Sequence, residues 1–307
     1  MNELLIAIDH GNKNIKTVSH VFPACFVESG HLPAIGSDTL VYNGKEYVLT
    51  NGRKAQKDDK AIDEDYFVLT LFAIGKELAS SGGGFAKNSM VDVTLLAGLP
   101  PLHVKELGRR FAEYLKRPDS INFSFNSLPM SVMIKNVYIY PQAYAAALTA
   151  LEHFKDAKTV SLIDCGGYTV DILQLTDLRP DMNICTSLYF GTNTLFQRIN
   201  ERVRAAGRKN IPDMVIEDIL LEPEPDASPE RIELVQSQTA EFAKTMLHEA
   251  AQAGLDLQEN RTVFVGGGSI LLKKYIQESG LVAKPIFVNN VHANAAGYNI
   301  IYNNRKR

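Results

Sequence analysis

Three glycine-containing turns follow apolar, strand-like segments, and each has residues that could contact a phosphate. They are Asp9-His10-Gly11-Asn12, Asp164-Cys165-Gly166-Gly167 and Gly266-Gly267-Gly268. At such turns backbone N–H groups can hold an anion where a side chain would obstruct its approach. A carboxylate repels a nearby phosphate unless a divalent cation lies between them, and Mg²⁺ is held by one or two carboxylates while it keeps several waters. Each turn alone is also compatible with a plain tight turn, but together they predict a site for a Mg²⁺-bound nucleotide.

The chain segments that contain Asp9 and Asp164 are similar to each other. "LLIAIDHGNKNIKTV" and "VSLIDCGGYTVDIL" share an apolar strand, the pattern Ile-Asp-x-Gly and a second β-prone arm. They begin two long stretches of comparable size, which is the pattern of an internal repeat. The repeat predicts two halves of similar topology, each contributing an Asp and a glycine turn to one cleft.

The other elements alternate between strand and helix, which is typical of an α/β protein. Asn43-Gly44 predicts a hairpin turn, because both residue types tolerate positive φ. "DEDYFVLTLFAIGKELASS" has apolar residues at helical spacing, and "YPQAYAAALTALEHF" predicts an Ala-rich helix opened by Pro141. Further strands are expected near 91–99, 121–139, 183–190 and 262–265, and further helices near 101–116, 192–207, 267–276 and 292–302, with a long helix ending near Ala253.

Composition limits the classes of protein that fit. The 307 residues are 45% hydrophobic and 22% charged, which is ordinary for a soluble globular protein. A net charge of −3 and a pI near 6.2 argue against direct nucleic-acid binding. The three cysteines form no C-x-x-C pair, and no apolar run is long enough to span a bilayer. We therefore expect a cytoplasmic protein without a membrane partner.

Other common sites fit poorly. Gly75-Lys76 lacks the upstream glycine and the following Ser or Thr of a P-loop. The sequence has neither a dinucleotide-binding glycine pattern after a strand nor a G-x-S-x-G elbow. Its seven histidines form no H-x-x-x-H pair, so a zinc site is not expected.

Four motifs, in order, resemble those of the actin-like ATPase superfamily, which also contains heat-shock chaperones and sugar kinases. "IDHGNKNIK" resembles the first phosphate loop and "IDCGGYTVDI" the second. "YPQAYAAAL" is similar to the connecting helix, and "VFVGGGSILL" to the adenosine motif. Three further segments, "YFVLTLFAIGKEL", "LLAGLPP" and "ANAAGY", resemble plasmid-segregation actins of the ParM and StbA type. The resemblance extends from about residue 4 to 302 and is weak between 205 and 260.

The resemblance implies an α/β fold of two actin-like (RNase H-like) domains that flank a nucleotide cleft. It places domain I at 1–157 plus 289–307 and domain II at 158–288. Asp9 and Asp164 would be the metal residues, Asp9 holding Mg²⁺ through water. Lys16 could equally be an exposed strand lysine. The nucleotide is expected to contact Asp9, Gly11, Asn12, Asn14, Lys16, Gly166, Gly167, Thr169, Gly266, Gly267, Gly268 and Ser269.

Two residues are candidates for catalysis, Gln142 and Asp164. Asp164 would position Mg²⁺ or the attacking water. Gln142 lies where the superfamily places a water-orienting Gln or Glu, although ParM relatives use Glu. A neutral amide is no strong base, so Gln142 should orient water rather than deprotonate it. A Gln without any role at the start of a helix is the alternative.

The neighbours of these residues have structural interpretations. His10 is expected to pack under its loop, and Cys165 to act as a small filler rather than a nucleophile. Asp171 matches the family pattern but could simply brace the second loop. The Gly82–Gly84 loop is a candidate contact surface or a linker.

The function that the resemblance implies is a bacterial actin-like protein. It would bind and hydrolyse ATP or GTP with Mg²⁺ and polymerise into dynamic filaments of its own copies, for plasmid DNA segregation. A separate DNA-binding adaptor would contact the DNA. One alternative is a sugar or acid kinase, in which Asp164 or Asp171 would be the base. The other is a chaperone-type ATPase, for which a C-terminal peptide-binding domain would be expected.

Overall fold

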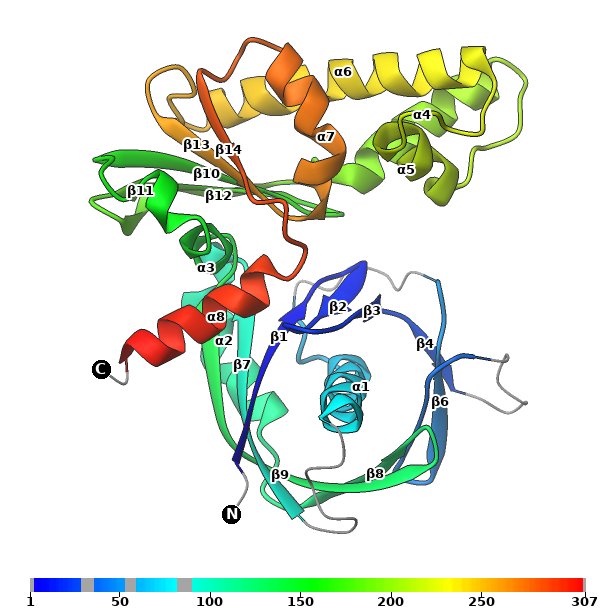
Figure 1. Ribbon diagram of the computed structural model, residues 1–307, viewed down its shortest axis with the longest axis vertical. Helices are drawn as coiled ribbons and strands as arrows, with labels where there is room; N and C mark the ends of the chain where they lie inside the picture. Colours follow the sequence, from blue (N-terminus) through cyan, green and yellow to red (C-terminus); the bar gives the residue numbers. More distant parts are fainter. Residues whose placement is uncertain (1–2, 29–35, 53–58, 82–89, 306–307) are drawn as a thin grey trace. The chain divides into compact units, whose positions relative to one another are not determined.

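The computed structural model describes residues 3–28, 36–52, 59–81 and 90–305. The chain separates into two compact units, each built on its own sheet (Figure 1). Unit 1 is Met1–Thr149 with His292–Arg307, and unit 2 is Ala150–Val291. The candidate contact loop Gly82–Gly84 lies outside the described residues.

Among the described residues of unit 1, nine strands form one sheet. The strands are β1 (Glu3–His10), β2 (Asn14–Lys16), β3 (Val21–Pro23), β4 (Phe26–Glu28), β5 (Thr39–Tyr42), β6 (Lys45–Leu49), β7 (Met90–Leu99), β8 (Ile121–Phe125) and β9 (Leu128–Pro141). Their order across the sheet is β3-β2-β1-β7-β9-β8-β5-β6-β4. β1, β7 and β9 run parallel, whereas β2 runs antiparallel to β1.

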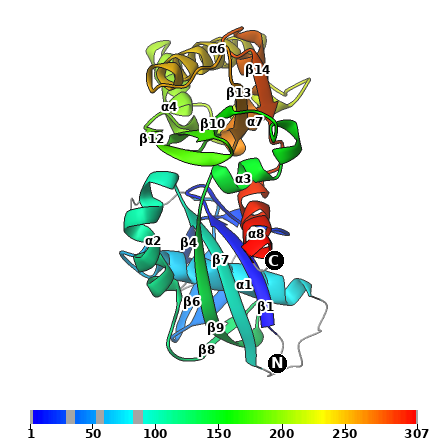
Figure 2. The ribbon, with the colours of Figure 1, turned by 90° about the vertical axis from the view of Figure 1, so that its left-hand side faces the viewer.

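The sheet of unit 1 curls around one helix, α1 (Asp65–Ser80), as Figure 1 shows. Residues 66–75 of α1 are all buried, which suits a helix that is apolar on every side. On the other face of β1 and β7 lies α8 (Ala293–Arg305), packed beside α3 (Tyr144–Leu148) (Figure 2). α2 (Pro101–Leu115) packs on β7 and β9. The two faces of the sheet therefore carry separate apolar clusters.

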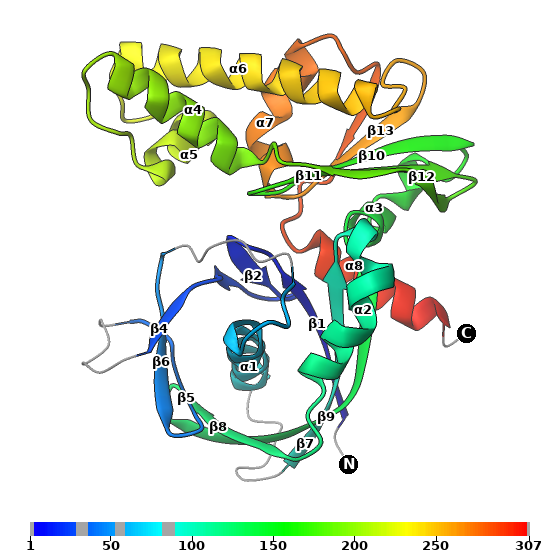
Figure 3. The same ribbon diagram turned by 180° about the vertical axis from the view of Figure 1, so that it is seen from behind.

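Unit 2 has a five-stranded sheet and a helical layer, as far as the described residues show (Figure 3). Its strands are β10 (Thr159–Cys165), β11 (Val170–Thr176), β12 (Arg179–Leu188), β13 (Arg261–Val265) and β14 (Lys284–Phe287). Its helices are α4 (Thr192–Ala205), α5 (Asp213–Leu221), α6 (Pro229–Gln252) and α7 (Gly267–Glu278), with a short 3-10 turn at Leu151–His153. The core between sheet and helices includes Ile163, Phe242 and Phe264.

The two units share one strand topology. Unit 2 has the order β12-β11-β10-β13-β14, and the first five strands of the unit 1 sheet have the order β3-β2-β1-β7-β9. The central strand of each set is equivalent. In unit 1, β1 pairs antiparallel with β2 and parallel with β7. In unit 2, β10 pairs antiparallel with β11 and parallel with β13. The predicted α/β fold of two similar halves is confirmed.

Most expected elements are present. Asn43 and Gly44 form the β5–β6 turn with φ of +50° and +74°, as a type I′ hairpin requires. The expected helix over "YPQAYAAALTALEHF" is wrong at its start. Pro141 is the last residue of β9, paired with Leu99, and the α-helix spans only Tyr144–Leu148. The third strand of unit 2 begins at Arg179 rather than near 183, and α5 was not foreseen.

Candidate functional site

The carboxylate of Asp9 lies at the end of β1 and is only 3% exposed. Gln142 Nε2 donates a hydrogen bond to Asp9 Oδ1 over 2.7 Å. Lys16, directly across the β1–β2 hairpin, places its Nζ 3.5 Å from Asp9 Oδ2. The fold thus brings Gln142, which is distant in sequence, to the hairpin that carries Asp9 and Lys16, and donors lie at both oxygens of the carboxylate.

A fourth side chain in this group was not foreseen as functional. Asn294, in the first turn of α8, has its Nδ2 3.5 Å from Asp9 Oδ2. Its Oδ1 accepts the backbone N–H of Ala143 over 3.1 Å. The sequence signal for this residue is the segment "ANAAGY", whose resemblance to plasmid-segregation actins implies no role for Asn294 by itself.

The rest of the first turn is set by local packing. A Cβ on Gly11 would lie 2.6 Å from the backbone oxygen of Asn14, so the turn excludes any larger residue there. The Oδ1 of Asn12 accepts a hydrogen bond from the hydroxyl of Tyr66 over 2.8 Å. This hydrogen bond ties Asn12, and through it the turn, to α1, which carries Tyr66.

His10 is fully buried beneath this turn, between the rings of Tyr66 and Phe111. The Thr70 hydroxyl donates to the Tyr66 carbonyl, so His10 Nε2–H is the donor to Thr70 Oγ1 over 2.8 Å. Burial, and after it the positive charge of Lys60, lowers the pKa of His10 to about 3, against the weaker opposing effect of Asp9. The imidazole is neutral and packs under the loop.

The second turn belongs to unit 2 and rests on the start of α4. The Gly166 N–H donates to the Thr169 carbonyl over 2.9 Å, which closes the turn between β10 and β11. The N–H groups of Thr192 and Asn193 donate to the carbonyls of Gly166 and Gly167 over 3.1 and 2.8 Å. These backbone hydrogen bonds fix the position of the turn relative to α4.

The glycine turn 266–268 packs on the strand end that bears Asp164. Gly266 has φ +84°, and a Cβ there would lie 2.2 Å from Asp164 Oδ1. A Cβ on Gly268 would lie 2.7 Å from the backbone oxygen of Cys165. Ser269 Oγ donates to the Gly266 carbonyl over 2.7 Å and so closes the start of α7. The predicted residues of unit 2 thus form one group around Asp164, which is 8% exposed.

Two glycines of unit 2 have no structural requirement for glycine. A Cβ on Gly267 would meet no atom within 4 Å, and one on Gly167 would make only an ordinary 3.9 Å contact with Asn193. Neither has a positive φ. Packing within the described chain therefore does not explain why both positions lack a side chain, whereas the close approach of a ligand to the backbone would.

Asp171 and Cys165 have structural surroundings. Asp171 is buried and accepts a hydrogen bond from the hydroxyl of Ser187 on β12. Cys165 is buried with its sulfur 3.8 Å from that of Met246. Burial, and after it the Asp164 carboxylate, raises the pKa of the Cys165 thiol. A thiol held neutral in this way is a poor nucleophile.

The donor chemistry of the two turns suits a hard cation. Among the described residues, no three His, Cys, Asp or Glu side chains gather as a metal-binding cluster. Asp9 and Asp164 are single buried carboxylates, the minimal protein ligands that Mg²⁺ uses when phosphates and waters complete its shell.

No described helix has the length and apolar character to cross a membrane.

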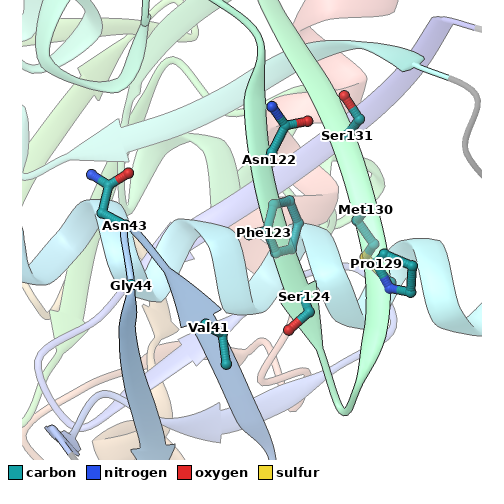
Figure 4. Close-up of a pocket in the computed structure, with 9 residues that line it drawn as sticks. All are labelled: Val41, Asn43, Gly44, Asn122, Phe123, Ser124, Pro129, Met130 and Ser131. Atoms are coloured by element: carbon teal, nitrogen blue, oxygen red, sulfur yellow. The ribbon is translucent and has the colours of Figure 1, made fainter.

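A groove on unit 1 lies apart from these residues (Figure 4). It has a volume of about 570 Å³ and is formed by β5, β8 and β9, with Phe123 and Met130 among its lining side chains. None of the predicted site residues lines it.

Comparisons with known proteins identify the fold. Residues 7–144 match the family model of the actin-like proteins N-terminal domain. No curated protein matches the sequence. An archaeal actin homolog, Ta0583, is similar with a TM-score of 0.79 and 16% identity over 98% of this chain and 99% of that one, and its complex with ADP matches with a TM-score of 0.76.

Two ParM structures are also similar. A 15-stranded ParM filament from Clostridium botulinum has a TM-score of 0.75 and 19% identity over 99% of this chain and 100% of that one. The apo pSK41 ParM protein has a TM-score of 0.72 and 15% identity over the whole of both chains. The chain therefore has the actin fold throughout and an actin-like N-terminal domain, and the resemblance stated from its motifs is confirmed.

Proposed function

We propose that this actin-like chain binds and hydrolyses a nucleoside triphosphate, ATP or GTP, and that binding drives its assembly into filaments. The proposal rests on one observation: a buried carboxylate lies beside glycine residues that packing does not require. Gly167 and Gly267 leave backbone open near Asp164 without any demand from packing. Glycine backbone that no side chain covers, beside a carboxylate, suits a phosphate bound with its cation.

The residues of unit 1 would supply the group that orients water. Because Gln142 Nε2 donates to Asp9, the amide oxygen Oε1 is left to accept a hydrogen bond from a water molecule. An amide cannot take the proton, so its contribution is orientation. Lys16, close to the same carboxylate, would place a positive charge near a phosphate.

Asp9 would hold Mg²⁺ through water and Asp164 would help to position it or the attacking water, and the cation would supply positive charge at the phosphates. Gly11, Asn12, Asn14, Gly166, Gly167 and Thr169 would contact those phosphates. Gly266, Gly267, Gly268 and Ser269 would lie at the nucleoside. These roles come from the resemblance, and the fold supports them by gathering each group within its own unit.

Self-assembly is supported by what the similar structures are. Three of them are described as filaments: the Clostridium botulinum ParM, Alp12, and AlfA bound to AMPPNP. The net charge of −3 gives the chain no general attraction to DNA, so a segregation role would need a DNA-binding adaptor. The proposed context is plasmid segregation in the cytoplasm.

The test combines sedimentation with phosphate release. Purified chain is centrifuged with ATP, GTP, ADP or a non-hydrolysable analogue, and hydrolysis is followed in parallel. We expect a pellet with a triphosphate or its analogue and little with ADP. The absence of polymer over a wide concentration range would contradict the filament proposal.

Asp164→Ala and the exposed-loop control Asp226→Ala separate binding from chemistry. The first should still bind nucleotide but hydrolyse it about 10²-fold more slowly, as expected when a group that stabilises the transition state is removed. The control should match the unmodified chain. Unchanged turnover in Asp164→Ala would show that the assignment of the second loop is wrong.

A further inference from the structure

The backbone next to Gln142 has an unusual conformation. Ala143 has φ +57° and ψ −61°, and the N–H of Tyr144 donates to the Gln142 carbonyl over 2.5 Å. This three-residue geometry is the rare γ-turn with positive φ. A residue with a Cβ occupies it only at a cost in free energy, so surrounding contacts must hold it.

The contacts that hold this turn come from two sides. On one side, the Gln142 N–H donates to the Leu99 carbonyl over 2.9 Å, which continues the pairing of β9 with β7. On the other side, the Ala143 N–H donates to Asn294 Oδ1 over 3.1 Å. Asn294 is 9% exposed and Ala143 is fully buried, so water does not readily replace the side-chain acceptor.

Asn294 contacts both sides of the Gln142–Asp9 hydrogen bond. Its Oδ1 fixes the backbone that carries Gln142, and its Nδ2 lies 3.5 Å from Asp9 Oδ2. A carboxamide carries its acceptor and its donor on separate atoms of one planar group, and Asn294 uses both. An aspartate would keep the acceptor but would place a second negative charge beside Asp9.

We propose that Asn294 is a positioning residue: by holding the strained turn at Ala143 it sets the direction in which Gln142 presents its amide. Asn294 itself need not touch the nucleotide. This inference rests on the proposed hydrolysis for its functional meaning. Its structural content, that Asn294 maintains the turn and the place of the Gln142 amide, is independent of any activity.

The kinetic experiment compares Asn294→Ala with Asn303→Ala, an exposed asparagine on the same helix. In Asn294→Ala we expect kcat to fall roughly tenfold or more, because small misplacements of an orienting group are costly. The dissociation constant for nucleotide should change little, since the glycine turns are untouched. Asn303→Ala should retain both values. A kcat for Asn294→Ala equal to that of Asn303→Ala would overturn the proposal.

A second variant tests the strain. In Asn294→Ala/Ala143→Gly, glycine takes a positive φ without the Cβ penalty, so the turn should form more often and kcat should rise above that of Asn294→Ala. A double variant no faster than Asn294→Ala would contradict the claim that Asn294 offsets strain at Ala143.

A readout without turnover separates this inference from the proposed function. Amide hydrogen exchange at Ala143 and the side-chain amide resonance of Gln142 are measured in protein without nucleotide. We expect faster exchange at Ala143 and a shifted Gln142 resonance in Asn294→Ala, with neither change in Asn303→Ala. Unchanged exchange and resonance would refute the positioning role. If the unmodified chain hydrolyses nothing, the proposed function fails while this comparison still decides the role of Asn294.

Discussion

The turns that bear Asp9 and Asp164 are topologically equivalent but are stabilised by different groups. Around Asp9 the contacts are made by side chains: Gln142, Lys16 and Asn294 surround the carboxylate, and His10 fills the space beneath. Around Asp164 the turns are rich in glycine, and backbone hydrogen bonds from the start of α4 hold the second turn in place. One strand order thus supports a turn surrounded by polar side chains in one unit and glycine-rich turns in the other.

One side chain of the first turn, the buried His10, should make the stability of the fold sensitive to acid. The pKa of His10 is lowered from its ordinary 6.5 to about 3 in the folded chain. Between these values the unfolded chain binds more protons, so stability rises with pH and is lost as pH falls below about 6.5. Without nucleotide or Mg²⁺, the His10 contribution should cost about 3 kcal/mol of unfolding free energy between pH 7.5 and pH 4.

The measurement is urea unfolding over that pH range for the unmodified chain, His10→Phe and His248→Gln. Phe fills a similar space between Tyr66 and Phe111 and cannot titrate, so its stability should depend less on pH. His248 is exposed on α6, and its replacement should leave the pH dependence unchanged. Parallel pH profiles for His10→Phe and the unmodified chain would show that His10 is not the source.

The two turns also differ in how far the sequence predicts them. The repeat of Ile-Asp-x-Gly predicts two equivalent hairpins, because in each copy a short apolar run that forms a strand leads into a turn that contains glycine. Sequence alone did not reveal that Gln142 bonds to Asp9, since that pairing depends on how β9 lies beside β7 and β1.

The misplaced start of the 140–154 helix has a physical cause. Proline is common at the first position of a helix, but it also favours extended backbone at the residue before it, here Tyr140. Pairing of Pro141 with Leu99 and the strained turn at Ala143 delay the helix to Tyr144. Asn294 could not be identified from its neighbours, because its partners Ala143 and Asp9 are far away in the sequence.

Neighbouring glycines of the 266–268 turn should respond differently to a methyl group. In Gly268→Ala the new Cβ would meet the Cys165 oxygen at 2.7 Å and the Thr192 methyl at 2.8 Å. Such overpacking should lower the unfolding free energy by about 2 kcal/mol. Gly267→Ala meets nothing and should be neutral or slightly stabilising, since alanine favours the first turn of α7. Urea unfolding of both variants measures the difference, and equal stabilities would contradict the backbone packing described for unit 2.

The smallest predicted effect concerns a glycine that the fold does not require. Gly167→Ala adds a methyl with only an ordinary 3.9 Å contact to Asn193, so stability should stay within about 0.5 kcal/mol. Nucleotide affinity should nevertheless fall about fivefold, near 1 kcal/mol, because the methyl occupies space that a phosphate needs. Fluorescent-nucleotide titration of Gly167→Ala beside Gly108→Ala, a helix α2 glycine with similar room for a methyl, checks this. If the affinity is unchanged in both variants, no ligand uses the space beside the Gly167 backbone. The glycine-rich turn of unit 2 would then have no ligand-binding role to distinguish it from the polar side chains around Asp9 in unit 1.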